Sequence, residues 1–318
     1  MILPSTAPDA LTRAVDTLSA GGLVALPTET VYGLAGLSTS AGSIAKIYEA
    51  KRRPHTNPLI SHVSGIEMAE RFVIMDPVSR RLAQAMWPGP LTLILPLRPG
   101  GIDRSSTNGQ ELAAIRAPAG FAHQVITRLD APLAAPSANT SGKISPTTAQ
   151  HVAEDLGARV DLIIDGGPAS LGVESTVVRV LPDGVAILRP GALSADMVAE
   201  LAGVPLIGAG AGDNELSPGT LQSHYAPDAA MRLNADHVQP GEVLLNFGAR
   251  QIAGTRQAAA VLDLSPKGDL SEAARNLFTY LHRADETGAA MIAVAPIPQS
   301  GIGVAINDRL QRAAAPRD

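Results

Sequence analysis

Cysteine is absent from this chain of 318 residues, and aromatic residues make up only 3% of it. The absence of cysteine excludes disulfides, thiolate metal sites and cysteine nucleophiles, and it fits a reducing compartment. With few aromatic residues and an apolar fraction of 45%, the core must consist of Ala, Val, Leu and Ile, which suits sheets covered by helices. We therefore expect an α/β protein.

Long apolar runs are also missing. No run approaches the ~20 residues that cross a bilayer, and the N-terminus has no basic region followed by an apolar stretch and a cleavage site. We expect a cytoplasmic protein that binds no membrane.

Acidic residues outnumber basic ones, 30 to 25, so that the formal net charge is -5 at pH 7. Affinity for nucleic-acid phosphates comes from accumulated Lys and Arg, so this balance disfavours a protein whose main task is to bind nucleic acid. The sequence also contains no Walker-type glycine loop, no HExxH helix and no GxSxG elbow. Arg and Ser side chains that converge from separate segments must therefore bind any nucleotide. We expect such a site in a local basic pocket.

The length favours two domains. In the first part of the chain, apolar spacing and turn residues predict alternating helices and strands, which indicates an open α/β sheet. The helices are expected at residues 9–20, 43–51, 77–86 and 195–201, and the strands at 23–26, 59–63, 91–95, 113–115, 132–135, 162–164, 176–180 and 185–188. The link from Leu181 to Gly184 is too short for a parallel crossover, so the sheet must be mixed.

Small and turn-forming residues then mark a boundary, first at 208–212 and again at Ser217-Pro218-Gly219. We expect a catalytic domain at 1–206, a linker at 207–228 and a small domain at 229–318. In the small domain, strands at 243–246, 260–264 and 291–294 flank a helix at 271–287, as in a βαβ unit.

Polar clusters follow several of the predicted strands, where open α/β sheets bind ligands. The segment PTETVYGL at 27–34 offers Thr28, Glu29 and Thr30 to an amine or hydroxyl, although helix capping is an alternative. The segment 51–62 gathers Lys51, Arg53, Asn57 and His62, which suits phosphate. A solvated basic helix end is its alternative.

Two further clusters are weaker when taken alone. Ser137, Asn139 and Ser145 lie in the segment 135–147, whose hydroxyls and amides could hold an anion or could merely form loops and a cap for a helix opening at Ser145-Pro146-Thr147. Charged groups also stand at strand ends, namely Arg116, Glu174 and Arg189. Structural pairing of Glu174 with an arginine is the alternative there.

Taken together, these clusters carry a resemblance. The segments occur in the order found in YrdC-like threonylcarbamoyl-AMP synthases, over roughly residues 10 to 200: PTETVYGL, KRRPHTNPLISH, WPGPLTLIL, APSANTSGKISPT, IIDGG, GVESTVV and LRPG. The segment SPGTLQSHYAP and the small domain after it resemble the two-domain branch, in which the linker folds over the active site. The resemblance implies a twisted mixed sheet around a deep basic cavity, plus a small Rossmann-like C-terminal domain.

The resemblance also implies roles for individual residues. Threonine is expected to contact Thr30, His62, Arg116 and Ser175. ATP is expected near Arg53, Asn57, Ser137, Asn139, Ser145, Arg189 and Tyr225. Lys51 and Arg53 are expected to be catalytic, by neutralising phosphate charge. No metal-ligating residue can be named, and His62 is a candidate general base only because its ordinary pKa lies near neutrality.

The implied reaction combines L-threonine, bicarbonate and ATP into threonylcarbamoyl-adenylate, pyrophosphate and water, with Mg²⁺ held mainly by the triphosphate and water. The adenylate would pass to a tRNA-modifying threonylcarbamoyl transferase, without direct tRNA binding by this chain. Two alternatives stay open. One is a module that binds double-stranded RNA or tRNA, and the other is a carbamoyl-adenylate transferase of the hydrogenase-maturation type.

Overall fold

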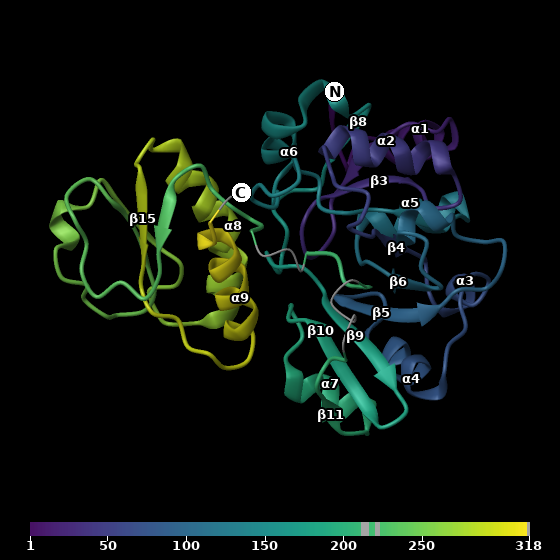
Figure 1. The fold of residues 1–318 in the computed structure, drawn as a ribbon. Coiled ribbons are helices and arrows are strands. Elements are labelled where there is room, and N and C mark those ends of the chain that lie inside the picture. Colours follow the sequence, from purple (N-terminus) through teal and green to yellow (C-terminus); the bar gives the residue numbers. More distant parts are fainter. Residues whose placement is uncertain (211–215, 220–222, 317–318) are drawn as a thin grey trace.

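The computed structural model describes residues 1–210, 216–219 and 223–316. Two sheets organise the chain, with strand orders β1-β8-β2-β3-β7-β4-β6-β5-β9-β10-β11 and β12-β15-β13-β14 (Figure 1). The strands of the first sheet are β1 (Ile2–Pro4), β2 (Val24–Leu26), β3 (Gly33–Leu37), β4 (Ile60–His62), β5 (Leu91–Pro96), β6 (Leu112–Arg116), β7 (Leu133–Ala134), β8 (Leu162–Asp165), β9 (Thr176–Leu181), β10 (Gly184–Arg189) and β11 (Leu206–Ile207). This sheet is mixed, as predicted, and the β9–β10 hairpin is antiparallel.

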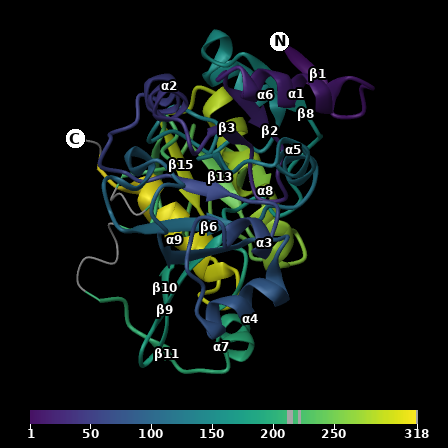
Figure 2. The same ribbon diagram turned by 90° about the vertical axis from the view of Figure 1, so that its right-hand side faces the viewer.

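Helices cover this sheet. The helices and strands of the first domain that were predicted with both ends are all present, and their ends differ by no more than two residues. The helices are α1 (Ala10–Ser19), α2 (Ala41–Lys51), α3 (Ile66–Ala69), α4 (Pro77–Met86), α5 (Phe121–Leu129), α6 (Ala149–Asp155) and α7 (Ala195–Ala202). Helices α1 and α5 pack side by side (Figure 2). The helix expected to open at Ser145 instead begins at Ala149, because the Thr148 hydroxyl accepts from the His151 N–H and caps it.

The strand β3 escaped prediction. Its sequence, Gly-Leu-Ala-Gly-Leu, has low intrinsic strand propensity. It forms because it lies between β2 and β7, and there a glycine is needed for space. A Cβ on Gly36 would lie 3.1 Å from the side chain of Leu23 and 3.2 Å from that of Ile47. Tertiary packing therefore overrides local propensity here.

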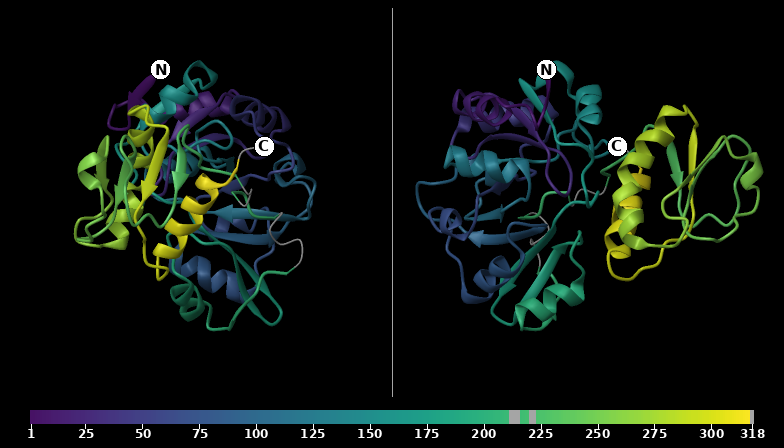
Figure 3. Two further views of the ribbon diagram at one scale, coloured as in Figure 1. Left: turned by 60° about the vertical axis from the view of Figure 1, so that its left-hand side comes forward. Right: turned by 180° about the vertical axis from the view of Figure 1, so that it is seen from behind.

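The C-terminal domain is a parallel sheet of β12 (Ala230–Arg232), β13 (Val243–Asn246), β14 (Ala260–Asp263) and β15 (Met291–Val294). The predicted helix is α8 (Leu270–Glu286), and a second helix, α9 (Gly303–Ala314), was not predicted. Both helices stand between this sheet and the first domain (Figures 1 and 3). The parallel arrangement confirms the α/β class of the second domain.

The two domains share a packed interface. One core cluster contains Val31 and Val173 of the first domain together with Leu277 and Phe278 of α8. Gly172 has φ +74°, and a Cβ there would lie 2.5 Å from the Ala274 carbonyl oxygen. The segments that precede β3 and β9 thus rest directly on α8. The proposed boundaries at 206 and 228 stay predictions, and residues 211–215 and 220–222 of the expected linker lie outside the described residues.

No helix among the described residues is long and apolar enough to cross a membrane.

Candidate active site

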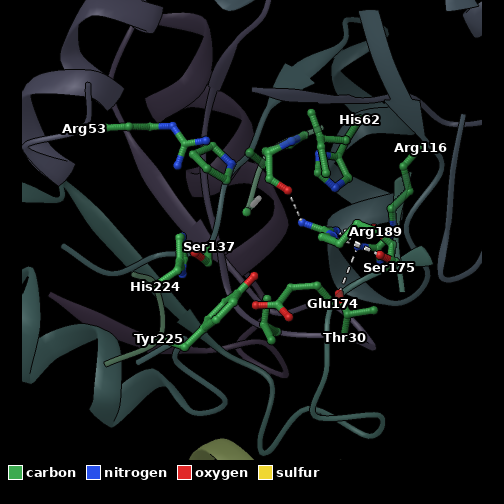
Figure 4. Close-up of a pocket in the computed structure, with 16 residues that line it drawn as sticks. Thr30, Arg53, His62, Arg116, Ser137, Glu174, Ser175, Arg189, His224 and Tyr225 are labelled. Atoms are coloured by element: carbon green, nitrogen blue, oxygen red, sulfur yellow. Dashed lines mark hydrogen bonds between the residues drawn. The ribbon is translucent and has the colours of Figure 1, made fainter. Parts of the chain in front are cut away.

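A cavity lies where the carboxyl ends of several strands of the first domain meet the segment after Leu216 (Figure 4). Its volume is about 50 Å³, which is room for only a few water molecules. It is lined by Thr30, Val31, Arg53, Ile60, His62, Arg116, Ala135, Pro136, Ser137, Glu174, Ser175, Arg189, Pro218, Gly219, His224 and Tyr225. Segments far apart in sequence therefore converge on one polar cavity.

Most of the predicted site residues line this cavity, namely Thr30, Arg53, His62, Arg116, Ser137, Ser175, Arg189 and Tyr225. Lys51, Asn57, Asn139 and Ser145 are not among its lining residues. Lys51, Asn57 and Ser145 instead hydrogen-bond to the lining residues Ser137, Arg53 and Glu174. Asn139 donates to the Thr140 and Lys143 carbonyls, which do not line the cavity. The structure thus separates residues that can touch a ligand here from residues that support them.

Arg116 ends β6 and is paired in register with His62 on the parallel strand β4. Its Nη1 donates to the Thr30 hydroxyl at 2.9 Å, and its Nη2 donates to Glu29 Oε1 at 2.6 Å. Nε donates to the Gly89 carbonyl oxygen at 3.1 Å. A guanidinium has five N–H groups, so further donors are left for a ligand. The hydrogen bonds to Thr30, Glu29 and Gly89 fix the direction in which the remaining N–H groups of Arg116 point.

His62 is buried beside Arg116, and its Nδ1 has no hydrogen-bond partner among the described residues. Burial first, and then the charge of Arg116, lower the pKa of His62 to about 3. The imidazole is therefore neutral and weakly basic at neutral pH, because both effects disfavour its protonated form. The suggestion that His62 serves as general base gains no support from this geometry, which instead favours neutral hydrogen bonding to a ligand.

This lowered pKa predicts how stability depends on pH. The unfolded state binds a proton to His62 near its ordinary pKa of 6.5, whereas the folded state does so only near 3. The free energy of unfolding should therefore fall as the pH drops below 6.5, by at most about 1.4 kcal/mol per pH unit for one histidine. Urea unfolding at a series of pH values should show a shallower fall for His62→Gln. His151, with a pKa of about 4, keeps some slope in the variant, and identical slopes would contradict the assignment.

Arg53 follows α2 and is held by the loop that leads into β4. Its Nε donates to the Asn57 carbonyl oxygen at 3.0 Å, and its Nη2 donates to the Asn57 side chain at 2.5 Å and to the Pro58 carbonyl oxygen at 2.8 Å. Burial lowers the pKa of Arg53 to about 10, so it is still a cation at neutral pH. Asn57 thus orients Arg53.

Lys51 was expected among the catalytic residues. Its ammonium donates to the backbone carbonyls of Ser137 at 2.6 Å and Asn139 at 2.5 Å. Burial, followed by the charge of Arg53, lowers its pKa well below the ordinary value. Lys51 therefore lies behind the loop that carries Ser137, and in this geometry it holds that loop in place.

Arg189 joins the two sides of the cavity. Its Nη2 donates to the Ser175 carbonyl oxygen at 2.9 Å and to the Ser175 hydroxyl at 3.1 Å, and its Nη1 donates to the Pro218 carbonyl oxygen at 2.8 Å. The Ser175 hydroxyl also shares a 2.7 Å hydrogen bond with Thr92. Arg189 therefore links the start of β9 to the segment that covers the cavity.

The distribution of charge is uneven around this cavity. Within the described residues, Arg116 pairs with Glu29, and Arg309 pairs with Glu174 and Asp308. Among the same residues, Arg53 and Arg189 donate only to uncharged oxygens. Arg53 is 6% exposed and Arg189 is 4% exposed. A buried charge without a counter-ion is costly, so the site is built to receive an anion.

The comparisons with known proteins agree with this geometry. Residues 16–191 match the family model described as Telomere recombination, and residues 193–315 match the model described as Threonylcarbamoyl-AMP synthase, C-terminal domain. A threonylcarbamoyl-AMP synthase of Bacillus subtilis is 37% identical over 98% of this chain and 95% of its own length. The crystal structure of Pyrococcus abyssi Sua5 complexed with L-threonine has a TM-score of 0.84 and 33% identity, covering 96% of this chain and 94% of that one.

This chain belongs to the threonylcarbamoyl-AMP synthase family. The family consists of enzymes of the nucleotidyltransferase type, so the chain is an enzyme. Both family models together reach from residue 16 to residue 315, so the resemblance identified from the first-domain motifs is confirmed for both domains.

Some residues of this threonylcarbamoyl-AMP synthase site were missed by sequence reasoning. Glu174 lines the cavity. In the sequence it was noted as a charged group at a strand end but was given no role in the site, and the alternative of structural pairing with an arginine is seen in its contact with Arg309. His224 lines it too, and its one sequence signal was the segment SPGTLQSHYAP. Arg309 gave no signal, because it acts from α9, a helix that was not predicted.

Gly219 covers the cavity in a conformation that favours glycine, with φ +83°. A Cβ at this position would lie 2.7 Å from the Tyr225 hydroxyl and 3.1 Å from Arg189 Nη1. Gly219→Ala should therefore strain the covered arrangement by about 1–3 kcal/mol, which corresponds to a roughly 5- to 160-fold loss of kcat/KM for ATP.

Gly241→Ala is the matched control, because Gly241 also has φ +83° but would place its Cβ within 4 Å of nothing. Thermal unfolding of both variants measures the backbone strain that they share. Equal loss of turnover in both would show that crowding at Tyr225 and Arg189 is unimportant.

Proposed function

We propose that this enzyme combines L-threonine, bicarbonate and ATP into threonylcarbamoyl-adenylate, with release of pyrophosphate and water. The observation that carries the proposal is the pair of buried arginines, Arg53 and Arg189, that face one cavity without a carboxylate partner among the described residues. The names of the relatives support the same product, and the Pyrococcus abyssi structure contains threonine. A triphosphate is the kind of anion that two such guanidinium groups bind well.

Threonine would lie at the end of the cavity formed by Thr30, His62, Arg116 and Ser175. The remaining N–H groups of Arg116 suit its carboxylate, because a planar guanidinium can donate two parallel hydrogen bonds. Glu29 already neutralises Arg116. Additional positive charge comes from Arg189, which lies close enough to Arg116 for the two charges to affect each other.

The chemistry needs positioning more than covalent help from the protein. The threonine amine attacks the carbon of bicarbonate, which gives a carbamate and water. Alternatively, bicarbonate takes up a proton and loses water to form carbon dioxide, and attack of the amine on that carbon gives the carbamate and returns the proton. A carbamate oxygen then attacks the α-phosphorus of ATP, and the bond to the bridging oxygen breaks to release pyrophosphate. Arg53 and Arg189 would stabilise the negative charge that develops on the phosphate oxygens. Lys51 would act through the loop that it holds.

Mg²⁺ would arrive with ATP and neutralise part of the triphosphate charge. No group of three or more His, Asp or Glu side chains able to hold a metal ion occurs in residues 1–210, 216–219 and 223–316. Phosphate oxygens and water would therefore provide most ligands, as is common for this cation. Glu174 is the carboxylate that lines the cavity.

The cavity is small, at about 50 Å³, so we propose that it widens when ATP and threonine bind. Pro218, Gly219, His224 and Tyr225 form one side of it, so displacement of this side would admit ATP. We propose that the segment covers bound substrates and limits the access of water to the adenylate. The product would then pass to a threonylcarbamoyl transferase that acts on tRNA.

The decisive experiment measures pyrophosphate release by the purified protein with ATP and Mg²⁺, in the presence and absence of L-threonine and of bicarbonate. Release that requires both, together with an adenylate product of the expected mass, supports the proposal. Release without threonine but with carbamoyl phosphate as donor would favour the carbamoyl-transfer alternative. Binding of double-stranded RNA without any turnover would favour the RNA-binding alternative, although Arg53, Arg116 and Arg189 are too buried to reach a duplex.

A further inference from the structure

Arg309 lies on α9 of the C-terminal domain, yet its side chain is fully buried against the catalytic cavity. Its Nε donates to Glu174 Oε2 at 2.8 Å, and its Nη2 donates to the Pro190 carbonyl oxygen at 2.9 Å. Its Cζ lies 5.2 Å from the centre of the Tyr225 ring. Because Glu174 and Tyr225 both line the cavity (Figure 4), one side chain of the second domain holds separate parts of its wall.

The charge of Glu174 is the reason why this contact matters. Its Oε1 accepts from the Ser145 hydroxyl at 2.7 Å, and its Oε2 accepts from Arg309. Burial alone would raise the pKa of Glu174, but the charges of Arg309 and then Arg189 outweigh it and keep the pKa below its ordinary value. Glu174 is therefore an anion inside a cavity that otherwise favours anions.

Arg189 is near enough to Glu174 for each charge to affect the other. In the part of the chain that the structure describes, however, Arg189 donates to Ser175 and Pro218 and to no carboxylate. A buried carboxylate that loses its partner is strongly driven to find another cation. Without Arg309, the nearby cation that lines the same cavity and has no carboxylate partner is Arg189.

We propose that Arg309 is a positioning residue that keeps Glu174 engaged and thereby leaves Arg189 available to the triphosphate of ATP. This inference rests on the proposed function, since it assigns the triphosphate to Arg189. The C-terminal domain thereby has a defined role. Through Arg309, the docked helix α9 determines how much positive charge of Arg189 is available to the nucleotide. The same side chain holds Tyr225 in the wall of the cavity.

The test is a charge-rescue experiment on the full chain. Titration calorimetry with ATP and Mg²⁺, without threonine, should show that Arg309→Met weakens ATP binding at least tenfold. Glu174→Gln removes the competing charge, so Glu174→Gln combined with Arg309→Met should bind ATP within threefold of Glu174→Gln alone. In turnover assays, Arg309→Met should raise KM for ATP more than it lowers kcat.

Controls separate this role from a merely structural one. Arg250→Met removes an exposed arginine of the same domain and should change neither ATP binding nor thermal unfolding. If Arg309→Met does not fold, the double variant compared with Glu174→Gln alone still decides the matter, because both buried charges of the Glu174–Arg309 pair are then neutralised. Asp308, which Arg309 also contacts, keeps its ion pair with Arg312. Unchanged ATP affinity in Arg309→Met, or a double variant tenfold weaker than Glu174→Gln, overturns the inference.

The proposed function is tested separately by threonine-dependent pyrophosphate release from the wild type. Its absence, with ATP binding and charge rescue intact, would refute the proposed reaction and keep the role of Arg309. Normal turnover without charge rescue would do the reverse.

Discussion

Arg53→Ala is expected to reduce kcat/KM for ATP by roughly 10²- to 10³-fold, the usual effect of removing one preorganised donor to developing negative charge. The reason is the position of Arg53, which lines the cavity, is 6% exposed and donates to no carboxylate among the described residues. Its hydrogen bonds to Asn57 and Pro58 fix the guanidinium before the substrate arrives. Steady-state pyrophosphate release at several ATP concentrations measures the effect.

Arg53→Lys and Arg52→Asn sharpen this test. Lysine keeps the charge but cannot make the hydrogen bonds to the 57–58 loop, so an intermediate loss is expected. Arg52 belongs to the same basic run but is exposed and lies in the left-handed conformation with φ 51°, which asparagine tolerates. Arg52→Asn should keep wild-type turnover. If it loses as much as Arg53→Ala, the run acts by its general charge and the specific assignment of Arg53 is wrong.

Arg116→Lys should reduce kcat/KM for threonine about 100-fold or more, with a smaller effect on KM for ATP. Arg116 donates to Gly89, Thr30 and Glu29 at once, and a lysine ammonium cannot reproduce this planar arrangement or the parallel hydrogen bonds expected for the carboxylate. Breaking a buried ion pair by removing one partner typically costs about 3–5 kcal/mol, but lysine retains the charge and should limit that loss.

This prediction can be checked separately for each substrate, because the effect on threonine use should exceed the effect on ATP use. Threonine and ATP are varied independently in the pyrophosphate assay, and thermal unfolding reports any general destabilisation. Glu29→Gln provides the companion measurement, because it leaves Arg116 without its counter-ion. In Glu29→Gln, the Arg116 guanidinium should be held less firmly in its direction. At the same time, more of its positive charge should be available to the carboxylate of threonine. Equal losses for threonine and ATP in Arg116→Lys would argue against a threonine subsite at Arg116.

The elements of the fold were largely predictable because apolar periodicity and turn residues are local signals. The four-residue link from Leu181 to Gly184 required antiparallel strands, and β9 and β10 are antiparallel. Prediction failed where local propensity and packing disagree. The glycine-containing strand β3 forms because it pairs with β2 and β7, and Leu23 and Ile47 crowd the position at which Gly36 lies.

The candidate site was predictable at the level of motifs. Arg53, Arg116 and Arg189 follow strands or helices at positions where polar clusters stand out from their surroundings, and the structure brings all three to one cavity. Lys51 was indistinguishable from Arg53 in the sequence. Only the structure shows that its ammonium reaches the carbonyls behind the loop at Ser137 and Asn139.

The sequence by itself determined the α/β class, the mixed sheet, the second domain and the family, because each depends on local spacing or on motifs in a fixed order. The tertiary structure alone decided which charges are neutralised. Glu174 and Arg309 are 135 positions apart, and Glu29 and Arg116 are 87 apart. Such pairs form only when packing brings distant segments together out of water, where an unpaired charge is costly. Because Glu174 and Glu29 are paired with Arg309 and Arg116 in this way, Arg53 and Arg189 are left to interact with an anion.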